Sequence, residues 1–198
     1  MGILDVSMEV PSLDDTMPDN ERFVRAIKKT TGASKVRLPF QVLTKIARVF
    51  RESNFEVRCV IRTSDEGDIF VYDVYPKSES VVIGGLAIDI GTTTVSALLI
   101  NMLTGEIIGK ASAGNGQIRY GADVINRIIE SMKPGGSEKL QKAVIDETIN
   151  PLIQQMCRAN GFKPEHIYRM SIAANTTMNH LMAGMEGDPI RMEPYIPT

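Results

Sequence analysis

A carboxylate, a glycine and a run of threonines stand close together in the sequence. Asp89 lies near the end of an apolar run, and Gly91, Thr92, Thr93 and Thr94 come soon after it. A tight turn of these residues places successive backbone N–H groups and hydroxyls around one concavity, which is a cradle for phosphate. Asp89 beside it could hold a Mg²⁺ ion, usually through water, because Mg²⁺ keeps much of its hydration shell. The pattern therefore predicts a nucleotide-phosphate site.

The alternative is a plain β-hairpin with a threonine-rich turn and a solvated aspartate. The flanking residues favour the phosphate site instead. Val81 to Ile90 is a nearly continuous apolar run, which is typical of a strand covered on both faces. A carboxylate at the end of such a strand is costly unless it is paired or faces a cation. We therefore expect Asp89 to serve a ligand.

The composition bounds the kind of protein that carries this turn. The chain has 198 residues, of which 43% are hydrophobic and 23% charged, as in ordinary globular chains of one or two domains. A formal net charge of −2 gives no basic excess for nucleic acid or an anionic membrane. No apolar run is long enough to span a bilayer, and the first residues lack a secretory signal. We expect neither a nucleic-acid nor a membrane partner.

Cysteine and histidine usage excludes several metal sites. The chain has two cysteines, Cys59 and Cys157, far apart in sequence. A structural zinc site or a four-cysteine iron–sulfur cluster cannot be built from them alone. A disulfide framework is equally disfavoured, which points to a reducing, cytoplasmic setting. His166 and His180 have no ligand-like spacing, so we expect surface or helix residues rather than metal ligands.

Residues 1–80 predict a small α+β domain. Its expected elements are an irregular segment 1–19, a helix from a cap at Asp19 or Asn20 to about Lys29 that stops at Gly32, a second helix with Pro39 in its first turn, and strands at about 55–63 and 69–75. The second helix carries an apolar stripe at Leu43, Ile46, Ala47 and Phe50. One face of the first strand is apolar at Phe55, Val57, Cys59 and Ile61. We expect the stripe and this face to be buried together.

Residues 81–198 predict an α/β domain. Its expected elements are strands at 81–90, 95–100, 106–113 and 167–173, a loop at 114–121, and helices at about 122–132, 137–160 and 176–184. Ser137 is the expected cap of the longest helix, Pro151 predicts a kink in it, and Gly161 ends it. The strand at 167–173 is expected to be buried like the strand at 81–90.

Several segments resemble a known family. "AIDIGTTTV" is similar to the first phosphate motif of the actin, Hsp70 and sugar-kinase ATPase superfamily, and the element order after it resembles the first half of that ribonuclease H-like fold. "GLAIDIGTTTVSALLINMLTGEII", "GADVINRI" and "ANTTMNHLMAG" resemble the reductive activators of corrinoid-dependent enzymes. Those proteins are iron–sulfur ATPases that reduce inactive cob(II)alamin in methyltransferase systems. "VPSLDDTMPDNERFVRAI" is similar to the segment between their ferredoxin and ATPase domains.

The resemblance implies roles for individual residues. Asp89 would be the Mg²⁺-associated carboxylate, and Gly91 to Thr94 would hold the β- and γ-phosphates of ATP. Asn175, Thr176 and Thr177 follow the fourth strand at its carboxyl end, where ligands bind in open α/β sheets, so they should face the same cleft. Asp123 in "YGADV" is either a cleft carboxylate or a charge that complements the dipole of a helix, and the sequence leaves both readings open.

Two departures from the family pattern shape the expected function. The ferredoxin domain, which would hold a [2Fe–2S] cluster, has no counterpart here, and only one Asp-x-Gly-Thr motif occurs. We therefore expect a fragment of an activator, catalytically incomplete alone, whose partner is a corrinoid protein or a corrinoid-dependent methyltransferase. Apolar surface left by truncation would favour homodimers.

Two other functions remain open at this stage. One is a sugar- or acetate-kinase-like phosphotransferase, which would need a phosphoryl-acceptor site. The other is a docking or dimerisation module that keeps the fold and has lost nucleotide binding. Binding of Mg²⁺-ATP separates the docking module from both enzymes.

Overall fold

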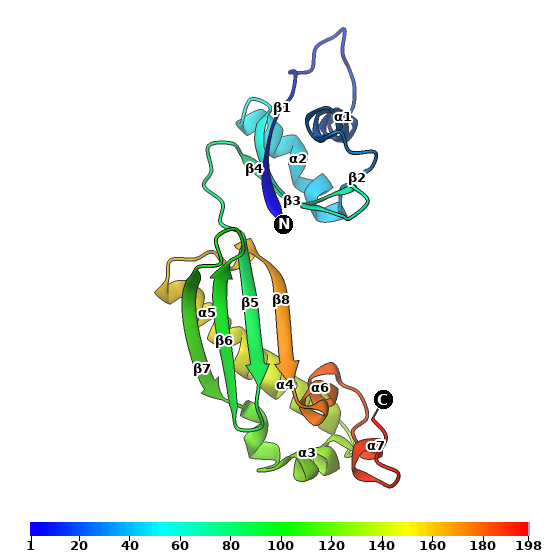
Figure 1. Ribbon diagram of the computed structural model, residues 1–198, viewed down its shortest axis with the longest axis vertical. Coiled ribbons are helices and arrows are strands. Elements are labelled where there is room, and N and C mark those ends of the chain that lie inside the picture. Colours follow the sequence, from blue (N-terminus) through cyan, green and yellow to red (C-terminus); the bar gives the residue numbers. More distant parts are fainter. Residues whose placement is uncertain (198) are drawn as a thin grey trace. The chain divides into compact units, whose positions relative to one another are not determined.

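The computed structural model describes residues 1–197 and divides into two compact units, the first formed by Met1–Ile83 and the second beginning at Gly84 (Figure 1). Each unit has its own four-stranded sheet, with strand order β1-β3-β4-β2 in the first and β7-β6-β5-β8 in the second. The hairpin β3–β4 is therefore not part of the second sheet. Within the described residues, no helix combines the length and the apolar character needed to cross a membrane.

The first unit packs two helices against its sheet. The elements are β1 (Gly2–Ser7), α1 (Asp19–Thr31), β2 (Val36–Arg37), α2 (Phe40–Glu52), β3 (Glu56–Thr63) and β4 (Ile69–Pro76). The strand β3 pairs antiparallel with both β1 and β4. The predicted apolar face of β3 is buried against Phe23 and Phe50 of the helices, which confirms the expected hairpin-on-helix packing. Burial raises the pKa of the Cys59 thiol to about 12, so this cysteine is an inert core residue.

Three expectations for the first unit are wrong. Gly2–Ser7 is a strand, although residues 1–19 were expected to be irregular, because β1 is held by backbone pairing with β3 and not by a strong apolar pattern of its own. Pro18 occupies the cap position of α1, and no side chain caps the helix. In α2, Ile46 and Phe50 are buried as expected, but Leu43 and Ala47 are exposed. Val42 and Val49 complete the stripe, which is thus rotated by one residue.

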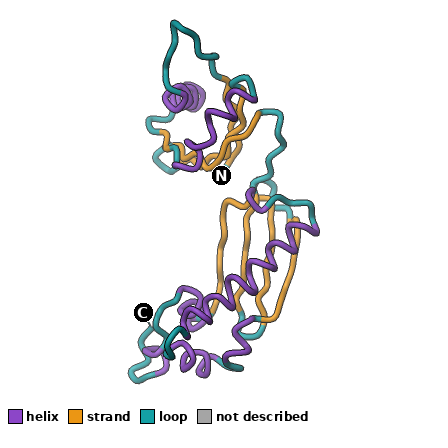
Figure 2. The backbone as a smooth tube through the Cα atoms, turned by 180° about the vertical axis from the view of Figure 1, so that it is seen from behind, coloured by secondary structure: helices purple, strands orange, loops and turns teal. Residues whose placement is uncertain are grey.

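The second unit covers one face of its sheet with helices. The elements are β5 (Gly84–Ile90), β6 (Thr94–Asn101), β7 (Ile107–Gly114), η1 (Gly116–Tyr120), α3 (Val124–Ser131), α4 (Gly136–Val144), η2 (Ile145–Ile149), α5 (Asn150–Ala159), η3 (Pro164–His166), β8 (Ile167–Ala174), α6 (Thr176–Ala183) and α7 (Asp188–Arg191). The α4–α5 stretch crosses the sheet, as seen from behind in Figure 2. It packs on Leu86, Ile88 and Ile90. Parallel pairing of β5 and β8 sets Ile90 beside Ala174, so both strands end at the same edge.

The expectation that strands 81–90 and 167–173 are covered on both faces is wrong. Ala87 and Asp89 alternate with the buried residues of β5 and are exposed on the opposite face. The strand β8 lies at the edge of the sheet, and its Met170 side is exposed. The alternation of buried and exposed positions was not visible in the sequence, because alanine and glycine occur at exposed positions as well as at buried ones.

The longest predicted helix is irregular near Pro151, as predicted, but the irregularity is a π-helical segment rather than a kink. The helical stretch from Gly136 to Ala159 is interrupted by the π-helical segment η2 just before Pro151. Proline has no N–H to donate, and its ring clashes with the carbonyl four residues earlier, so the wider turn accommodates it. Ser137 does not cap this helix, because Gly135, with φ of 68°, takes that position.

Candidate anion-binding site

In the turn between β5 and β6, three consecutive backbone carbonyl groups accept hydrogen bonds from Asn115 and Arg127. The Gly91 carbonyl accepts a hydrogen bond from Asn115 Nδ2 at 2.9 Å. The Thr92 carbonyl accepts one from Arg127 Nη2 at 2.7 Å, and the Thr93 carbonyl accepts one from the backbone N–H of Asn115 at 2.8 Å. Both donor side chains are buried, with 1% of Asn115 and 0% of Arg127 exposed. The three carbonyls therefore point into the protein.

The opposite side of the same peptide groups faces outward. These peptide bonds are trans, and in a planar trans peptide the N–H points away from the C=O. The N–H groups of Thr92, Thr93 and Thr94 are thus directed away from Asn115 and Arg127. Within residues 1–197, the N–H groups of Thr92 and Thr93 make no hydrogen bond to the chain. Successive outward N–H groups of this kind form a concavity for an anion.

Gly91 is required for the close approach that shapes this turn. Its N–H donates to the Thr94 carbonyl at 2.9 Å, which closes the turn. A Cβ atom at this position would lie 2.7 Å from the same carbonyl oxygen. Gly114, which pairs with Thr94 on the neighbouring strand, has open space where a Cβ would stand.

Asn175 brings the end of the fourth strand to the same turn. Its Oδ1 accepts a hydrogen bond from the Met178 N–H at 2.9 Å and so caps α6. Its Nδ2 lies 3.4 Å from the Thr92 hydroxyl. The N-terminal end of α6, with Thr176 exposed and Thr177 mostly buried, therefore lies next to the turn. A helix N-terminus adds free N–H groups and a partial positive charge there.

Asp89 stands two residues before the turn on the open face of the sheet. Its side chain is exposed and has no hydrogen bond or ion pair to any residue in the part of the chain the structure describes. It lies opposite Ser96 in register and lines a hollow of about 440 Å³ with small residues such as Ser112 and Ser171. The cost of burying Asp89, which the sequence suggested, therefore does not arise. Its free carboxylate fits a cation held through water.

Asp123 caps the helix α3. Its Oδ1 accepts a hydrogen bond from the Asn126 N–H at 2.8 Å, and its Oδ2 accepts one from Asn126 Nδ2 at 2.9 Å. This position agrees with the reading in which the charge complements a helix dipole. A role as a cleft carboxylate stays a prediction.

The sequence pattern did not predict the two anchors of the turn, Asn115 and Arg127. Arg127 donates from Nε to the Gly121 carbonyl at 2.8 Å as well as to Thr92, and its Nη1 lies 3.5 Å from Gln117 Oε1. No carboxylate within residues 1–197 forms a salt bridge with it. Burial lowers the pKa of Arg127, and the charge of Asp123 opposes that shift. Its place beside Ile128, on the apolar side of α3, was the available signal.

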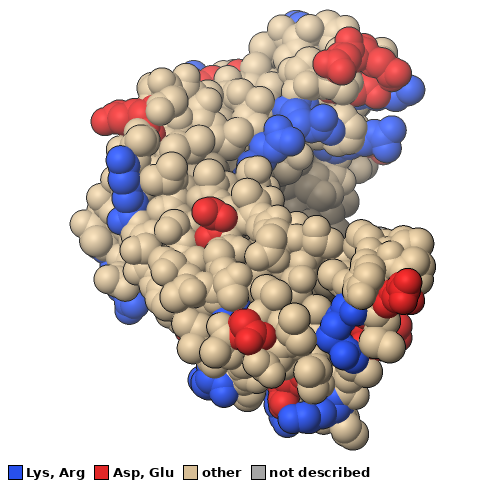
Figure 3. Space-filling view, turned by 60° about the horizontal axis from the view of Figure 1, so that its bottom comes forward, with Lys and Arg blue, Asp and Glu red and all other residues tan. Residues whose placement is uncertain are grey.

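Charged side chains form no single large patch of one sign on the face shown in Figure 3, where groups of acidic and basic residues are separated by uncharged areas.

Comparison with known proteins identifies the family. The model of the RACo middle region matches residues 84–198, and that of the RACo linker region matches residues 3–80. The chain belongs to the RACo family. It is 29% identical over 159 residues to the corrinoid activation enzyme RamQ of Eubacterium limosum, which covers 79% of this chain and 26% of RamQ. The family resemblance seen in the sequence is confirmed.

A solved RACo-type structure shows the same fold. The structure titled "Reductive activator for corrinoid,iron-sulfur protein" matches 100% of this chain with a TM-score of 0.79 and 34% sequence identity. The predicted α/β fold class, with a small α+β unit before the second sheet, is confirmed, whereas its assignment to the actin/Hsp70-like superfamily stays a prediction. This chain spans 31% of that structure's length, so the activity of a whole RACo protein does not follow from the match alone.

The cysteines and histidines of this RACo chain offer no cluster site. Cys59 and Cys157 are both buried and belong to different units. His166 and His180 lie in helical segments, as one reading of the sequence had it, and both are buried. Among the residues that the structure describes, no three of His, Cys, Asp and Glu are grouped to hold a metal ion. A [2Fe–2S] cluster in a ferredoxin domain stays a prediction.

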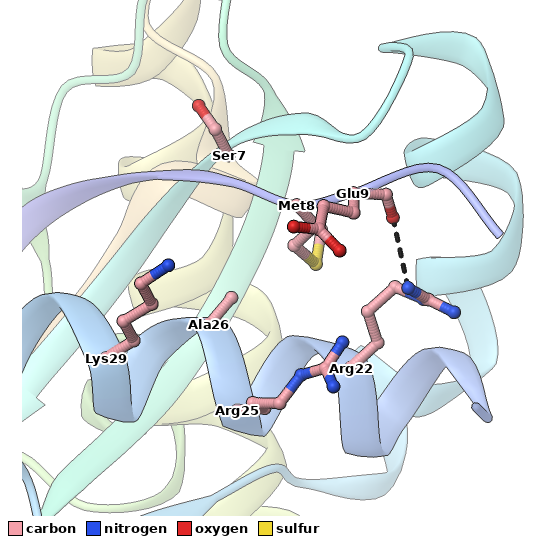
Figure 4. Close-up of a pocket in the computed structure, with 7 residues that line it drawn as sticks. All are labelled: Ser7, Met8, Glu9, Arg22, Arg25, Ala26 and Lys29. Carbon is pink, nitrogen blue, oxygen red and sulfur yellow. Dashed lines mark hydrogen bonds between the residues drawn. The ribbon is translucent and has the colours of Figure 1, made fainter. Parts of the chain in front are cut away.

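A second cavity, in the first unit, is explained by local structure. It measures about 310 Å³ and lies between the end of β1 and α1, lined by Glu9, Arg22, Arg25 and Lys29 among others (Figure 4). Arg22 Nη1 donates to the Glu9 carbonyl at 3.2 Å and to Asp15 Oδ2 at 2.6 Å. The buried arginine thus ties the segment after β1 to α1.

Proposed function

We propose that this chain is the linker and first ATPase lobe of an ATP-dependent activator that reduces inactive cob(II)alamin on a corrinoid protein of a methyltransferase system. The linker would be residues 1–80 and the lobe residues 81–198. The names of RamQ and of the solved RACo structure support the corrinoid partner. The observation that carries the ATP-binding part is the two outward N–H groups of Thr92 and Thr93, free within residues 1–197, in peptide groups whose carbonyls are held by Asn115 and Arg127.

Each site residue has a defined task in this proposal. The N–H groups and hydroxyls of Thr92, Thr93 and Thr94 bind the β- and γ-phosphate oxygens, and the N-terminal end of α6 adds donors at Thr176. Asp89 orients the water shell of Mg²⁺, which neutralises phosphate charge when it is bound. Asn175 keeps α6 and the turn together through its contact with the Thr92 hydroxyl.

The coupling to electron transfer is conformational in this proposal. The turn is joined to η1 through Asn115, to α3 through Arg127 and to α6 through Asn175. A bound phosphate that contacts the turn can therefore favour one arrangement of these elements, because a ligand shifts an equilibrium through its different affinity for two states. The single electron that converts cob(II)alamin to cob(I)alamin would come from an iron–sulfur cluster that residues 1–197 do not supply.

The test is ATP-dependent reduction by the whole activator. Full-length protein, a reduced iron–sulfur donor and the corrinoid protein are mixed, and loss of cob(II)alamin absorbance is followed with and without Mg²⁺-ATP. We expect reduction to require ATP in the wild type and to fall sharply in Gly91→Ala, while Gly114→Ala behaves like the wild type. Reduction that proceeds equally without ATP would reject the proposal. Failure of the protein to bind Mg²⁺-ATP would favour the docking module instead.

A further inference from the structure

We infer that Arg127 is a positioning residue of the anion site, whose buried guanidinium orients and polarises the Thr93 N–H toward a bound phosphate. The inference deepens the proposed function and rests on it for the identity of the natural ligand. Arg127 itself does not reach the ligand. It acts through the peptide group that joins Thr92 to Thr93.

The geometry links the guanidinium to the concavity in one step. Arg127 Nη2 donates to the Thr92 carbonyl at 2.7 Å, and the N–H of Thr93 belongs to the same peptide group. Hydrogen bonds in a chain polarise one another, so a cation at the carbonyl makes the opposite N–H a better donor. Asn115 Nδ2 holds the preceding peptide in the same way but carries no charge. The strongest donor of the turn should therefore be the Thr93 N–H.

No carboxylate within residues 1–197 forms an ion pair with Arg127. The side chain is fully buried and binds carbonyl oxygens, a glutamine and the sulfur of Met178, with no carboxylate paired to it. Burying a cation is costly when no carboxylate is paired with it, and the charge of Asp123 offsets only part of that cost. An anion bound across the Thr92–Thr93 peptide supplies the missing negative charge. The positive charge of Arg127 is therefore expected to be unfavourable in the ligand-free protein and to become favourable when an anion binds.

The binding experiment uses two probes and three variants. Tripolyphosphate and Mg²⁺-ATP are titrated calorimetrically into the full-length activator as wild type, Arg127→Met, Arg127→Lys and the control Arg158→Met, which removes an exposed arginine from α5. We expect Arg127→Met to weaken tripolyphosphate binding roughly ten- to hundredfold, because a charge-assisted hydrogen bond and its polarising effect are lost. Arg127→Lys should weaken tripolyphosphate binding less, because the lysine ammonium keeps the positive charge but lacks the planar set of N–H donors of the guanidinium. Arg158→Met should bind like the wild type.

A spectroscopic readout separates positioning from a general structural role. In ¹⁵N-threonine-labelled protein, tripolyphosphate should shift the Thr93 amide proton downfield in the wild type. Arg127→Met should reduce that shift, and Arg127→Lys should restore part of it. If Arg127→Met shows no cooperative unfolding on heating, it is not properly folded, and the test then rests on the affinity and the Thr93 amide shift of Arg127→Lys. A Lys variant with wild-type affinity and an unchanged amide shift overturns the inference.

The outcomes distinguish the inference from the proposed function. Tripolyphosphate binding that depends on Arg127, without Mg²⁺-ATP binding, supports the inference and rejects the proposed function. Mg²⁺-ATP binding that is equal in the wild type and Arg127→Met overturns the inference and leaves the proposed function standing. A wild type that binds neither probe overturns both.

Discussion

The two buried arginines of this protein, one in each unit, have opposite surroundings. Arg22 is 1% exposed and pairs with the Asp15 carboxylate at 2.6 Å, while also donating to backbone carbonyls of the segment after β1. Arg127 is 0% exposed and has no carboxylate partner within residues 1–197. Both hold a loop to a helix. Only Arg22 does so while paired with a carboxylate, that of Asp15.

The difference supports our inference that Arg22 has a structural role whereas Arg127 serves a ligand. A buried ion pair is complete in the folded protein, so removing its cation costs stability and nothing else. Arg127 binds only uncharged groups, and under our inference its anion is the bound phosphate. We therefore expect the first unit to need Arg22 for folding and the second unit to need Arg127 most when a phosphate is bound.

The largest effect is expected from Arg22→Met. The substitution deletes the donors to the Glu9 and Asp15 carbonyls and leaves Asp15 without its closest cation. We expect the first unit to lose about 2–4 kcal/mol of unfolding free energy. Hydrogen exchange of the amides in residues 1–83 measures this loss. Tripolyphosphate affinity should not change, and a drop like that of Arg127→Met would remove the distinction between the two arginines.

Gly91→Ala should affect the anion site of the second unit rather than the stability of the first unit. The added methyl would meet the Thr94 carbonyl at 2.7 Å, so the turn must open and its N–H groups must diverge. We expect tripolyphosphate and Mg²⁺-ATP affinity to fall roughly tenfold or more, the equivalent of one or more misplaced hydrogen bonds. Gly114→Ala is the matched control, because its methyl meets no atom within 4 Å. Equal calorimetric affinities for the two variants would place the anion elsewhere.

Asp89→Asn should remove the contribution of Mg²⁺ without harming the fold. Asp89 is exposed and unpaired, so the ligand-free unfolding temperature should stay near that of the wild type. Mg²⁺-ATP affinity should fall roughly tenfold, whereas ATP without Mg²⁺ should bind as before. The measurement is thermal unfolding with ATP, with and without Mg²⁺, and Asp146→Asn on η2 is the control. A variant that keeps the full Mg²⁺-dependent shift would show that the metal lies elsewhere.

The smallest effect concerns pH. Hydrogen bonds from Arg58, Arg22 and Lys77 hold the pKa values of Asp5, Asp15 and Glu56 below their usual range, and all these residues lie in the first unit. A depressed carboxyl pKa adds stability above its unfolded value, and this stability is lost as the pH falls through the folded value.

The first unit should therefore lose stability below about pH 4. Asp15→Asn should lessen this acid sensitivity, which unfolding of residues 1–83 at pH 3 to pH 6 would measure. The effect is small because these carboxylates are largely solvated. An unchanged acid profile in the variant would mean that the Asp15–Arg22 pair adds nothing to the pH dependence.

Local patterns were enough to predict much of both units. The strands 55–63, 69–75, 95–100 and 106–113 agree with the structure because apolar alternation and turn residues are properties of neighbouring positions. Gly32 ends α1 in the left-handed conformation, as predicted, because only its own φ of 73° is involved. The strand β1 was missed because its pairing partners in β3 lie about fifty or more positions away in the sequence, and β1 itself has little apolar pattern.

The sequence by itself determined the family, the fold class and the residues of the Gly91–Thr94 turn. Only the tertiary structure decided what makes that turn a candidate site. Asn115 and Arg127 reach it across 24 and 35 positions of the chain, and no local periodicity marks a polar side chain that is buried to hold a distant carbonyl. The open face that leaves Asp89 solvated was likewise set by which side the α4–α5 stretch covers. Hydrogen bonds and burial between distant segments depend on partners that a local pattern does not contain.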